Sequence, residues 1–273
     1  MNRELFVDIL SSFITSAKFT RHEYEEYVKH SIETEAEAAN SDPTTRAIEL
    51  AHNLAFRSGL GSSLFAPTHN SIAAEDVKSF ASSVFTKDNI AVLGTGIEHS
   101  RLAKLSEKCF NLQASATSTV PASKYYGGES RVESSSGPQT LFIGFGTSGR
   151  PPADLAALWA HLSPEPSIKW SDGLSPMASI PKDSSVQSLY LPYSDGTLLG
   201  LLVQGATAAS VREAGKAAVQ ALKSAASGLK EDELKRAIAK ARFNAAQAAD
   251  RKEGLVHALG AKVDENFTLF SRD

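Results

Sequence analysis

A histidine followed by two glutamates in the N-terminal region is the part of the sequence most similar to a zinc-hydrolase motif. Such hydrolases need two histidines one helical turn apart plus a carboxylate, as in HExxH or its inverted form HxxEH. Here the order is His22-x-x-Glu25-Glu26, with glutamate in place of the second histidine, and His30 lies a full turn too far along to replace it. We therefore interpret His22 and His30 as solvated positions on an acidic helix.

Neighbouring residues do not complete a metal site or a nucleophilic one. Glu33, Glu35 and Glu37 could supply one carboxylate ligand, but without imidazole partners they indicate a solvated face. Cys109 has no activating partner nearby, and a GxSxG motif does not occur, so nucleophilic catalysis has no support. The sequence thus predicts no catalytic, cofactor-binding or metal-binding residues and no cofactor.

A glycine motif in the second half matches the dinucleotide-binding fingerprint in its spacing. Gly144-x-Gly146-x-x-Gly149 follows an expected strand and precedes an expected helix. However, Pro151 and Pro152 stand where the phosphate-binding helix should begin, and they remove two amide donors that a phosphate would use. We interpret the glycines as a turn and reject the cofactor hypothesis.

Composition narrows the classes of protein. With 273 residues, 42% of them hydrophobic and 22% charged, the chain is expected to fold and is long enough for two domains. The net charge is −3 and the basic residues are scattered, so no nucleic-acid partner is expected. Its one cysteine excludes an internal disulfide and fits a reducing compartment such as the cytosol or the mitochondrial matrix.

The N-terminal residues and the apolar runs bear on membranes and targeting. The longest candidate span, Leu198 to Val203, is far shorter than the ~20 apolar residues that cross a bilayer. Glu4 and Asp8 argue against a mitochondrial transit peptide, so the start of the chain suggests a cytosolic protein or one that begins within a domain.

The first half is expected to be mainly helical. Periodicity predicts helix over most of residues 4–39, with a break near Phe19-Thr20 where Thr20 and Glu23 form a capping box. Pro43 is expected to open a helix that ends before Gly59 and Gly61. Further elements are expected as follows: a helix over Ala74–Phe85, a buried strand over Asn89–Gly94 and a helix over Ser100–Phe110.

A segment of lost periodicity, rich in Ser, Thr, Ala and Pro, separates the two halves. We place a first domain at residues 1–112, a linker at 113–124 and a second domain at 125–273. The second half is expected to contain these elements: strands Thr140–Phe145 and Leu198–Gln204, helices Ala153–Leu162, Ala208–Ser227 and Glu231–Ala249, a functional or poorly ordered loop over Ser163–Ser188, and a possible strand beginning in Glu265–Asp273.

The order of these features resembles a known family of zinc peptidases. The acidic helix from Tyr24 to Glu37 is followed by an Asp-Pro break, then by Leu60-Gly61 and by Ser63-Leu64-Phe65-Ala66-Pro67. The similarity continues through residues 72–77 and 87–99 and resumes at Tyr126-Gly127-Gly128-Glu129-Ser130-Arg131. In this order the chain resembles the pitrilysin and mitochondrial processing peptidase family.

That resemblance implies an α+β fold with two homologous α/β sandwich domains, each with a mostly antiparallel sheet. The family's HxxEH helix would lie upstream of the region matched by Leu5 to Phe19, which implies a first domain that is incomplete at its N-terminus. The third metal ligand of active members would fall near Glu35. The resemblance therefore implies a peptidase-like chain without a working metal site.

Within the family, Tyr27-Val28-x-x-Ser31-Ile32-Glu33-x-Glu35 and the Ala-rich second half look most like the core subunits of mitochondrial ubiquinol-cytochrome c reductase. This implies a non-catalytic structural subunit, peripheral on the matrix side of the inner membrane. Its expected partners are core protein 1, cytochrome b and cytochrome c1 in a hetero-oligomer. Two alternatives stay open. The first is a presequence-binding alpha-type subunit of the processing peptidase, which the resemblance disfavours because the glycine-rich loop of that subunit corresponds to Ser163–Ser188, where Gly173 is the one glycine. The second is an active zinc endopeptidase whose motif lies in missing sequence.

Overall fold

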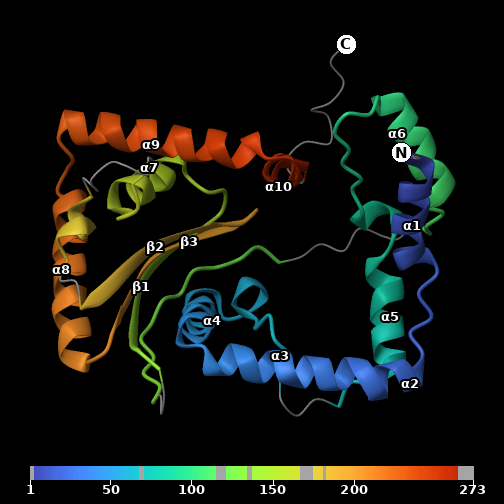
Figure 1. The fold of residues 1–273 in the computed structure, drawn as a ribbon, viewed down its shortest axis with the longest axis horizontal. Coiled ribbons are helices and arrows are strands. Elements are labelled where there is room, and N and C mark those ends of the chain that lie inside the picture. Colours follow the sequence, from blue (N-terminus) through green and yellow to red (C-terminus); the bar gives the residue numbers. More distant parts are fainter. Residues whose placement is uncertain are drawn as a thin grey trace. The chain divides into compact units, whose positions relative to one another are not determined.

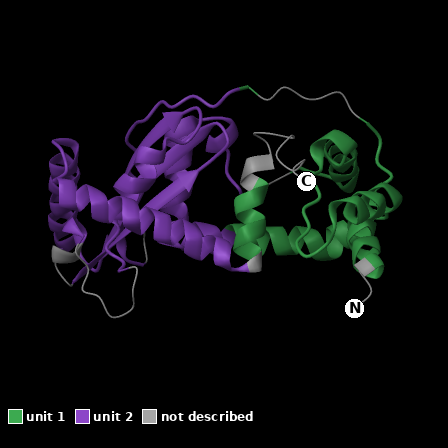
Figure 2. Cartoon of the chain, turned by 90° about the horizontal axis from the view of Figure 1, so that it is seen from above, with its two compact units in different colours: residues 1–36, 66–121, 252–273 green, residues 37–65, 122–251 purple. Residues whose placement is uncertain are grey.

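The computed structural model describes residues 3–67, 71–114, 121–133, 137–166, 175–180 and 183–263. The chain forms two compact units (Figure 2). Unit 1 comprises Met1–Ala36, Ala66–Pro121 and Lys252–Asp273, and unit 2 comprises Glu37–Phe65 and Ala122–Arg251. The expected division at 113–124 remains a prediction; by contacts, residues 37–65 group with the second half of the chain.

Unit 1 is helical in its described part. Its elements are α1 (Arg3–Thr15), α2 (Arg21–Glu23), the π-helical turn η1 (Tyr24–Val28), α5 (Ala74–Val84), the 3₁₀ turn η3 (Lys87–Asn89), α6 (His99–Cys109) and α10 (Lys252–Val263), and α3 (Lys29–Ser41) continues from unit 1 into unit 2. Helix α1 contacts α6, and the hydroxyl of buried Tyr24 donates a 2.9 Å hydrogen bond to the carbonyl of Ile72. These contacts join segments that are far apart in the sequence.

The expected break between the first helices is confirmed. Phe19 adopts a positive φ of 50°, which an α-helix cannot accommodate, and Thr20 is the N-cap of α2. The capping box differs from the expectation, because the Thr20 hydroxyl donates to the carboxylate of Glu23 and makes no bond to the helix backbone.

The prediction of a strand over Asn89–Gly94 is wrong. Residues 90–94 have no regular secondary structure, although Ile90 has extended φ and ψ angles of −119° and 127°. A strand is stabilised by hydrogen bonds to a neighbouring strand. The described residues of unit 1 include no strand, so this apolar run has no pairing partner there.

Unit 2 is built on an antiparallel three-stranded sheet, as the expected fold class requires. Strands β1 (Gln139–Ser148), β2 (Ser184–Pro192) and β3 (Gly196–Gly205) are arranged in the order β1-β3-β2. The apolar sequence of β3 explains its central place, because nine of its ten residues are buried. Strand β2 corrects the expectation of a loop over Ser163–Ser188, since pairing with β3 begins at Ser184; residues 167–174 and 181–182 lie outside the described part.

Helices cover both faces of this sheet (Figure 1). On one face, Leu201 and Val203 of β3 pack with Val211, Ala214 and Ala218 of α8 (Ala208–Ala226). Helix α7 (Ala153–Leu162) adds Leu162 to this core, and α9 (Glu231–Asp250) packs on α7.

The opposite face carries α4 (Pro43–Phe56), whose Ala55 and Phe56 pack against Leu198. Odd-numbered residues of β3 therefore face α8 and even-numbered ones face α4. In the described ranges, helices are too short or too polar to cross a membrane.

Candidate functional site

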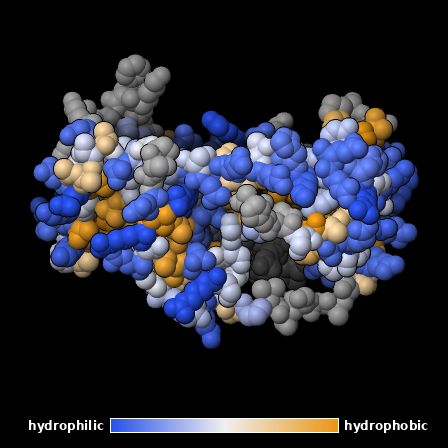
Figure 3. Space-filling view, turned by 90° about the horizontal axis from the view of Figure 1, so that it is seen from below, coloured by the Kyte–Doolittle hydropathy of each residue, from blue (hydrophilic) through white to orange (hydrophobic). Residues whose placement is uncertain are grey.

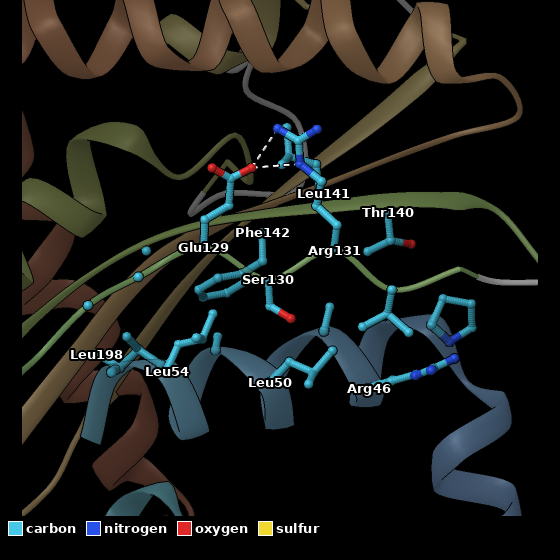
Figure 4. Close-up of a pocket in the computed structure, with 18 of the residues that line it drawn as sticks. Arg46, Leu50, Leu54, Glu129, Ser130, Arg131, Thr140, Leu141, Phe142 and Leu198 are labelled. Atoms are coloured by element: carbon cyan, nitrogen blue, oxygen red, sulfur yellow. Dashed lines mark hydrogen bonds and ion pairs between the residues drawn. The ribbon is translucent and has the colours of Figure 1, made fainter. Parts of the chain in front are cut away.

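A pocket of about 600 Å³ lies between α4 and β1 in unit 2 (Figure 4). Leu50 and Leu54 rise from α4 toward Phe142 of β1, and Leu198 of β3 closes one end. Residues 127–132, which have no regular secondary structure, line the pocket together with these apolar residues. The pocket is thus open to solvent at a polar rim and apolar inside.

Helix α4 is positioned by its first and last turns. The Asp42 carboxylate caps the helix by accepting from the amides of Thr44 at 3.3 Å and Thr45 at 2.9 Å. The hydrogen bond from the Thr45 hydroxyl, followed by those from the amides, holds the pKa of Asp42 below its ordinary value. At the other end Phe56 is 1% exposed and anchors the helix on the sheet.

Charged groups lie on the rim of the pocket. Arg46 comes from α4, and Arg131 forms a 2.7 Å ion pair with Glu129 whose side chains are 88% and 71% exposed. An ion pair this exposed contributes little to stability. The described lining combines apolar, hydroxyl and charged side chains, which suits binding of a ligand with apolar and polar groups.

The metal-motif residues of the sequence lie in a different part of the fold. His22, Glu25, Glu26 and His30 are all exposed around α2, η1 and the start of α3. Glu35 is exposed as well. Within the described ranges, His, Cys, Asp and Glu side chains do not gather in groups of three that could hold a metal ion.

The glycine motif lies in the sheet and at its end. Gly144 and Gly146 belong to β1, which pairs antiparallel with β3, whereas a dinucleotide fingerprint requires a parallel βαβ unit. Gly149 follows the strand with a φ of 86° and donates its amide to the carbonyl of Asp195 at 2.7 Å. That left-handed conformation favours glycine in a turn.

Cys109 is half-buried at the end of α6.

Sequence reasoning missed the pocket. It located the helix after Pro43 and the strand after Thr140 separately, but no spacing in the sequence indicates that they pack together. The signal available in the sequence was the polar, glycine-containing run Tyr126-Gly127-Gly128-Glu129-Ser130-Arg131. In the structure Gly127 has a φ of 73°, which few other residues adopt.

Comparisons with known proteins give consistent results. The family model described as Insulinase (Peptidase family M16) matches residues 2–68. The chain is 39% identical over 270 residues to "Cytochrome b-c1 complex subunit 2, mitochondrial" of Cryptococcus neoformans, covering 95% of this chain and 62% of that protein. The protein of the same name from Yarrowia lipolytica is 33% identical over 262 residues, covering 94% of this chain and 62% of the relative.

A solved structure shares the fold. A chain of "Complex III2 from Candida albicans, Inz-5 bound" matches with a TM-score of 0.74 and 17% identity, over 95% of this chain and 65% of that one. The chain spans about three fifths of the length of these two curated relatives. The N-terminal part of the chain thus matches the insulinase family of peptidases, M16, and the chain is similar over nearly its whole length to proteins named cytochrome b-c1 complex subunit 2.

Proposed function

We propose that this chain acts as a non-catalytic structural core subunit of the mitochondrial ubiquinol-cytochrome c reductase, the cytochrome b-c1 complex. In this role it lies on the matrix side of the inner membrane as a peripheral subunit. Its partners are core protein 1, cytochrome b and cytochrome c1, and it needs no cofactor of its own.

The observation that carries this proposal is 39% identity to a subunit 2 of that complex over 95% of the chain. Identity on this scale extends through both compact units, so it is not confined to a shared peptidase motif. The fold match at a TM-score of 0.74 to a chain of a complex III structure is consistent with it.

Exposed apolar side chains in unit 1 also support a role in assembly. Helix α1 exposes Leu5 by 53%, Phe6 by 57%, Leu10 by 56% and Phe13 by 72%. A contiguous apolar face of this kind is typical of a surface that another polypeptide covers. Figure 3 shows one side of the molecule, where apolar residues reach the surface in patches between hydrophilic ones.

The chemistry of the residues present supports a non-catalytic role. His22-x-x-Glu25-Glu26 departs from HxxEH at the second histidine, and these side chains are exposed on unit 1. Zinc catalysis needs three protein ligands around an open coordination position, and exposed residues without an imidazole pair do not supply them.

Deletion and complementation of the gene test this function. We expect deletion to remove ubiquinol-cytochrome c reductase activity and to lower the cytochrome b signal in difference spectra, and the natural gene to restore both. A His22→Ala, Glu25→Gln, Glu26→Gln variant should restore them fully, because these side chains do no chemistry. Normal reductase activity in the deletion strain would contradict the proposal.

The second candidate is a presequence-binding subunit of the processing peptidase. It is supported by 29% identity over 210 residues to "Mitochondrial-processing peptidase subunit alpha-2" of Dictyostelium discoideum, which covers 71% of this chain and 47% of that protein. In this case the deletion strain would accumulate uncleaved precursor proteins while preassembled reductase stayed active. Precursor processing is therefore measured in the same strains.

A further inference from the structure

The pocket between α4 and β1, called the α4 pocket from here on, has a different character at each end. Its volume of about 600 Å³ is the space that remains with residues 127–132 in place along its border. Leu54 and Leu198 lie at one end and Arg46 lies at the other (Figure 4). Because an α-helix rises about 1.5 Å per residue, Arg46 and Leu54 are about 12 Å apart along the axis of α4. The pocket therefore offers an elongated ligand one charged end and one apolar end.

The side chains of the apolar end carry no hydrogen-bonding group. They belong to Leu50 and Leu54 of α4, Phe142 of β1 and Leu198 of β3, with alanines of α4 between the two leucines and around them. Burying a polar group against such side chains without a hydrogen bond is unfavourable, whereas burying an alkyl chain is favourable. A nucleotide base or a sugar would leave its polar groups unpaired here, so an alkyl chain suits this end best.

Arg46 leaves a positive charge uncompensated at the other end. Its side chain is half-buried, and no ion pair joins it to a described residue. Asp42, one turn earlier, is engaged elsewhere, because its carboxylate accepts from two backbone amides at the start of α4. The other charged residues of the described lining, Arg131 and Glu129, form an ion pair with each other. The described lining therefore carries one net positive charge, that of Arg46.

The polar group beside Arg46 is already satisfied within the protein. The Thr140 hydroxyl donates to the carbonyl of Pro138 at 3.1 Å and accepts from the side-chain amide of Gln204 at 3.2 Å. The Arg46 guanidinium carries five N–H donors and has no hydrogen-bond partner among the described residues. A guanidinium binds a carboxylate through two parallel hydrogen bonds, so this end suits a single carboxylate.

We propose that the α4 pocket binds a medium-chain fatty acid. Arg46 holds its carboxylate, and the alkyl chain lies along α4 toward Leu54 and Leu198. Each methylene that leaves water strengthens binding about fourfold, so the chain supplies most of the affinity and Arg46 sets the orientation. Residues 127–132 need not move, because the ligand occupies the volume that they leave free. This inference goes beyond the structural role and does not depend on the complex in which the chain works.

A second hollow in unit 2 provides an internal control for this assignment. It lies beside α8, has Leu141 and Ile143 among its lining residues, and carries the exposed cations Arg212, Lys216 and Lys223. A fatty acid bound there would depend on the cations of α8 and not on Arg46. Substitution of one arginine at each place therefore distinguishes the two locations.

Equilibrium dialysis of the purified full chain tests the proposal with radiolabelled decanoate, octanoate and 1-decanol, each below the concentration at which it aggregates. We expect decanoate to bind about tenfold more tightly than octanoate, which lacks two methylenes. It should also bind about tenfold more tightly than 1-decanol, which has the same chain without the charge. Equal affinity for the three ligands, or no binding of decanoate, would overturn the proposal.

Variants of α4 separate the contributions of charge and of volume. Arg46→Gln should weaken decanoate about tenfold and leave 1-decanol unchanged, whereas Arg46→Lys keeps the charge and should weaken decanoate by about threefold at most. Ala47→Phe places a ring in the pocket and should abolish binding of both ligands. Arg212→Gln, beside α8, should change neither. Thermal melts confirm that each variant is folded.

Two results with folded variants would contradict the assignment. Equal losses of decanoate and 1-decanol binding in Arg46→Gln would show that Arg46 does not contact the carboxylate. Loss of decanoate binding in Arg212→Gln, with Arg46→Gln unchanged, would place the ligand in the hollow beside α8 and overturn the proposed site.

Discussion

Nε2 of His52 on α4 and the phenolic oxygen of Tyr193 at the β2–β3 turn lie 2.6 Å apart. Nδ1 of His52 is 2.8 Å from the carbonyl of Ile48, to which it can only donate, so in the neutral ring Nε2 accepts from the Tyr193 hydroxyl. The two rings meet edge to face with centroids 5.8 Å apart. This contact connects the helix that forms the pocket to the far end of the sheet.

Loss of this hydrogen bond should destabilise unit 2. Tyr193→Phe is expected to lower the free energy of unfolding by about 1 kcal/mol, because the ring stays packed while His52 loses its donor. Urea unfolding followed by circular dichroism measures the change. Tyr126→Phe is the matched control, since the Tyr126 ring is 48% exposed against Arg57; an equal effect in both variants would contradict the role of the pair.

Alkaline pH should weaken the same contact. Burial, and then the charge of Glu49, raise the pKa of Tyr193 above its ordinary value of 10.0, so the folded state favours the neutral phenol. Its contribution to stability is complete below pH 10.0 and is lost as pH rises through the folded pKa. The difference in stability between the natural chain and Tyr193→Phe should therefore narrow above pH 10.0, and a constant difference would contradict this.

The Asp42 cap of α4 should stabilise the fold at neutral pH and lose this effect in acid, whereas the Tyr193 contact is weakened by alkali. Asp42→Ala is expected to cost about 1 kcal/mol of stability at pH 7, whereas Asp42→Asn keeps an acceptor for the Thr45 amide and should be close to neutral.

In acid, the lowered pKa of Asp42 means that its contribution is present above its ordinary value of 3.8 and is lost as pH falls through the folded pKa. In acid, the natural chain should therefore become no more stable than Asp42→Ala. The Asp42→Asn variant should stay more stable than Asp42→Ala, because its side chain does not titrate. Denaturant titrations at pH 7 and in acid measure this, and parallel pH profiles for all three proteins would contradict it.

Phe56 should be the most sensitive aromatic position of α4. Its side chain is 1% exposed between α4 and the sheet, so Phe56→Ala is expected to cost about 3–5 kcal/mol through lost burial and a residual cavity. Phe80→Ala is the control, because Phe80 is 69% exposed on α5 and should change stability by less than about 1 kcal/mol. Thermal melts compare the two, and similar midpoints would contradict the packing described for α4.

Local signals predicted most of the described helices and two of the three strands of the described sheet. Pro43 after Asp42 indicated the start of α4, and the spacing of Val77, Phe80, Ala81 and Val84 indicated α5. These features depend on neighbours within one or two helical turns, so the sequence alone is sufficient to find them.

Features that depend on distant partners could not be predicted in the same way. Asn89–Gly94 has the composition of a strand, but the described residues of unit 1 supply nothing for it to pair with. Strand β2 is hidden among Ser and Gln residues and is stabilised by its register with β3. The pocket arises because α4 packs against β1, some ninety residues later in the chain. The strand expected within Glu265–Asp273 lies outside the described residues.

Affinity purification of the endogenous protein from gently solubilised mitochondria, followed by identification of the co-purifying subunits, tests the central claim most directly. The proposed function predicts cytochrome b, cytochrome c1 and core protein 1 in fixed proportion to this chain. Recovery of a processing-peptidase beta subunit without the cytochromes would contradict it and would assign the chain to presequence binding.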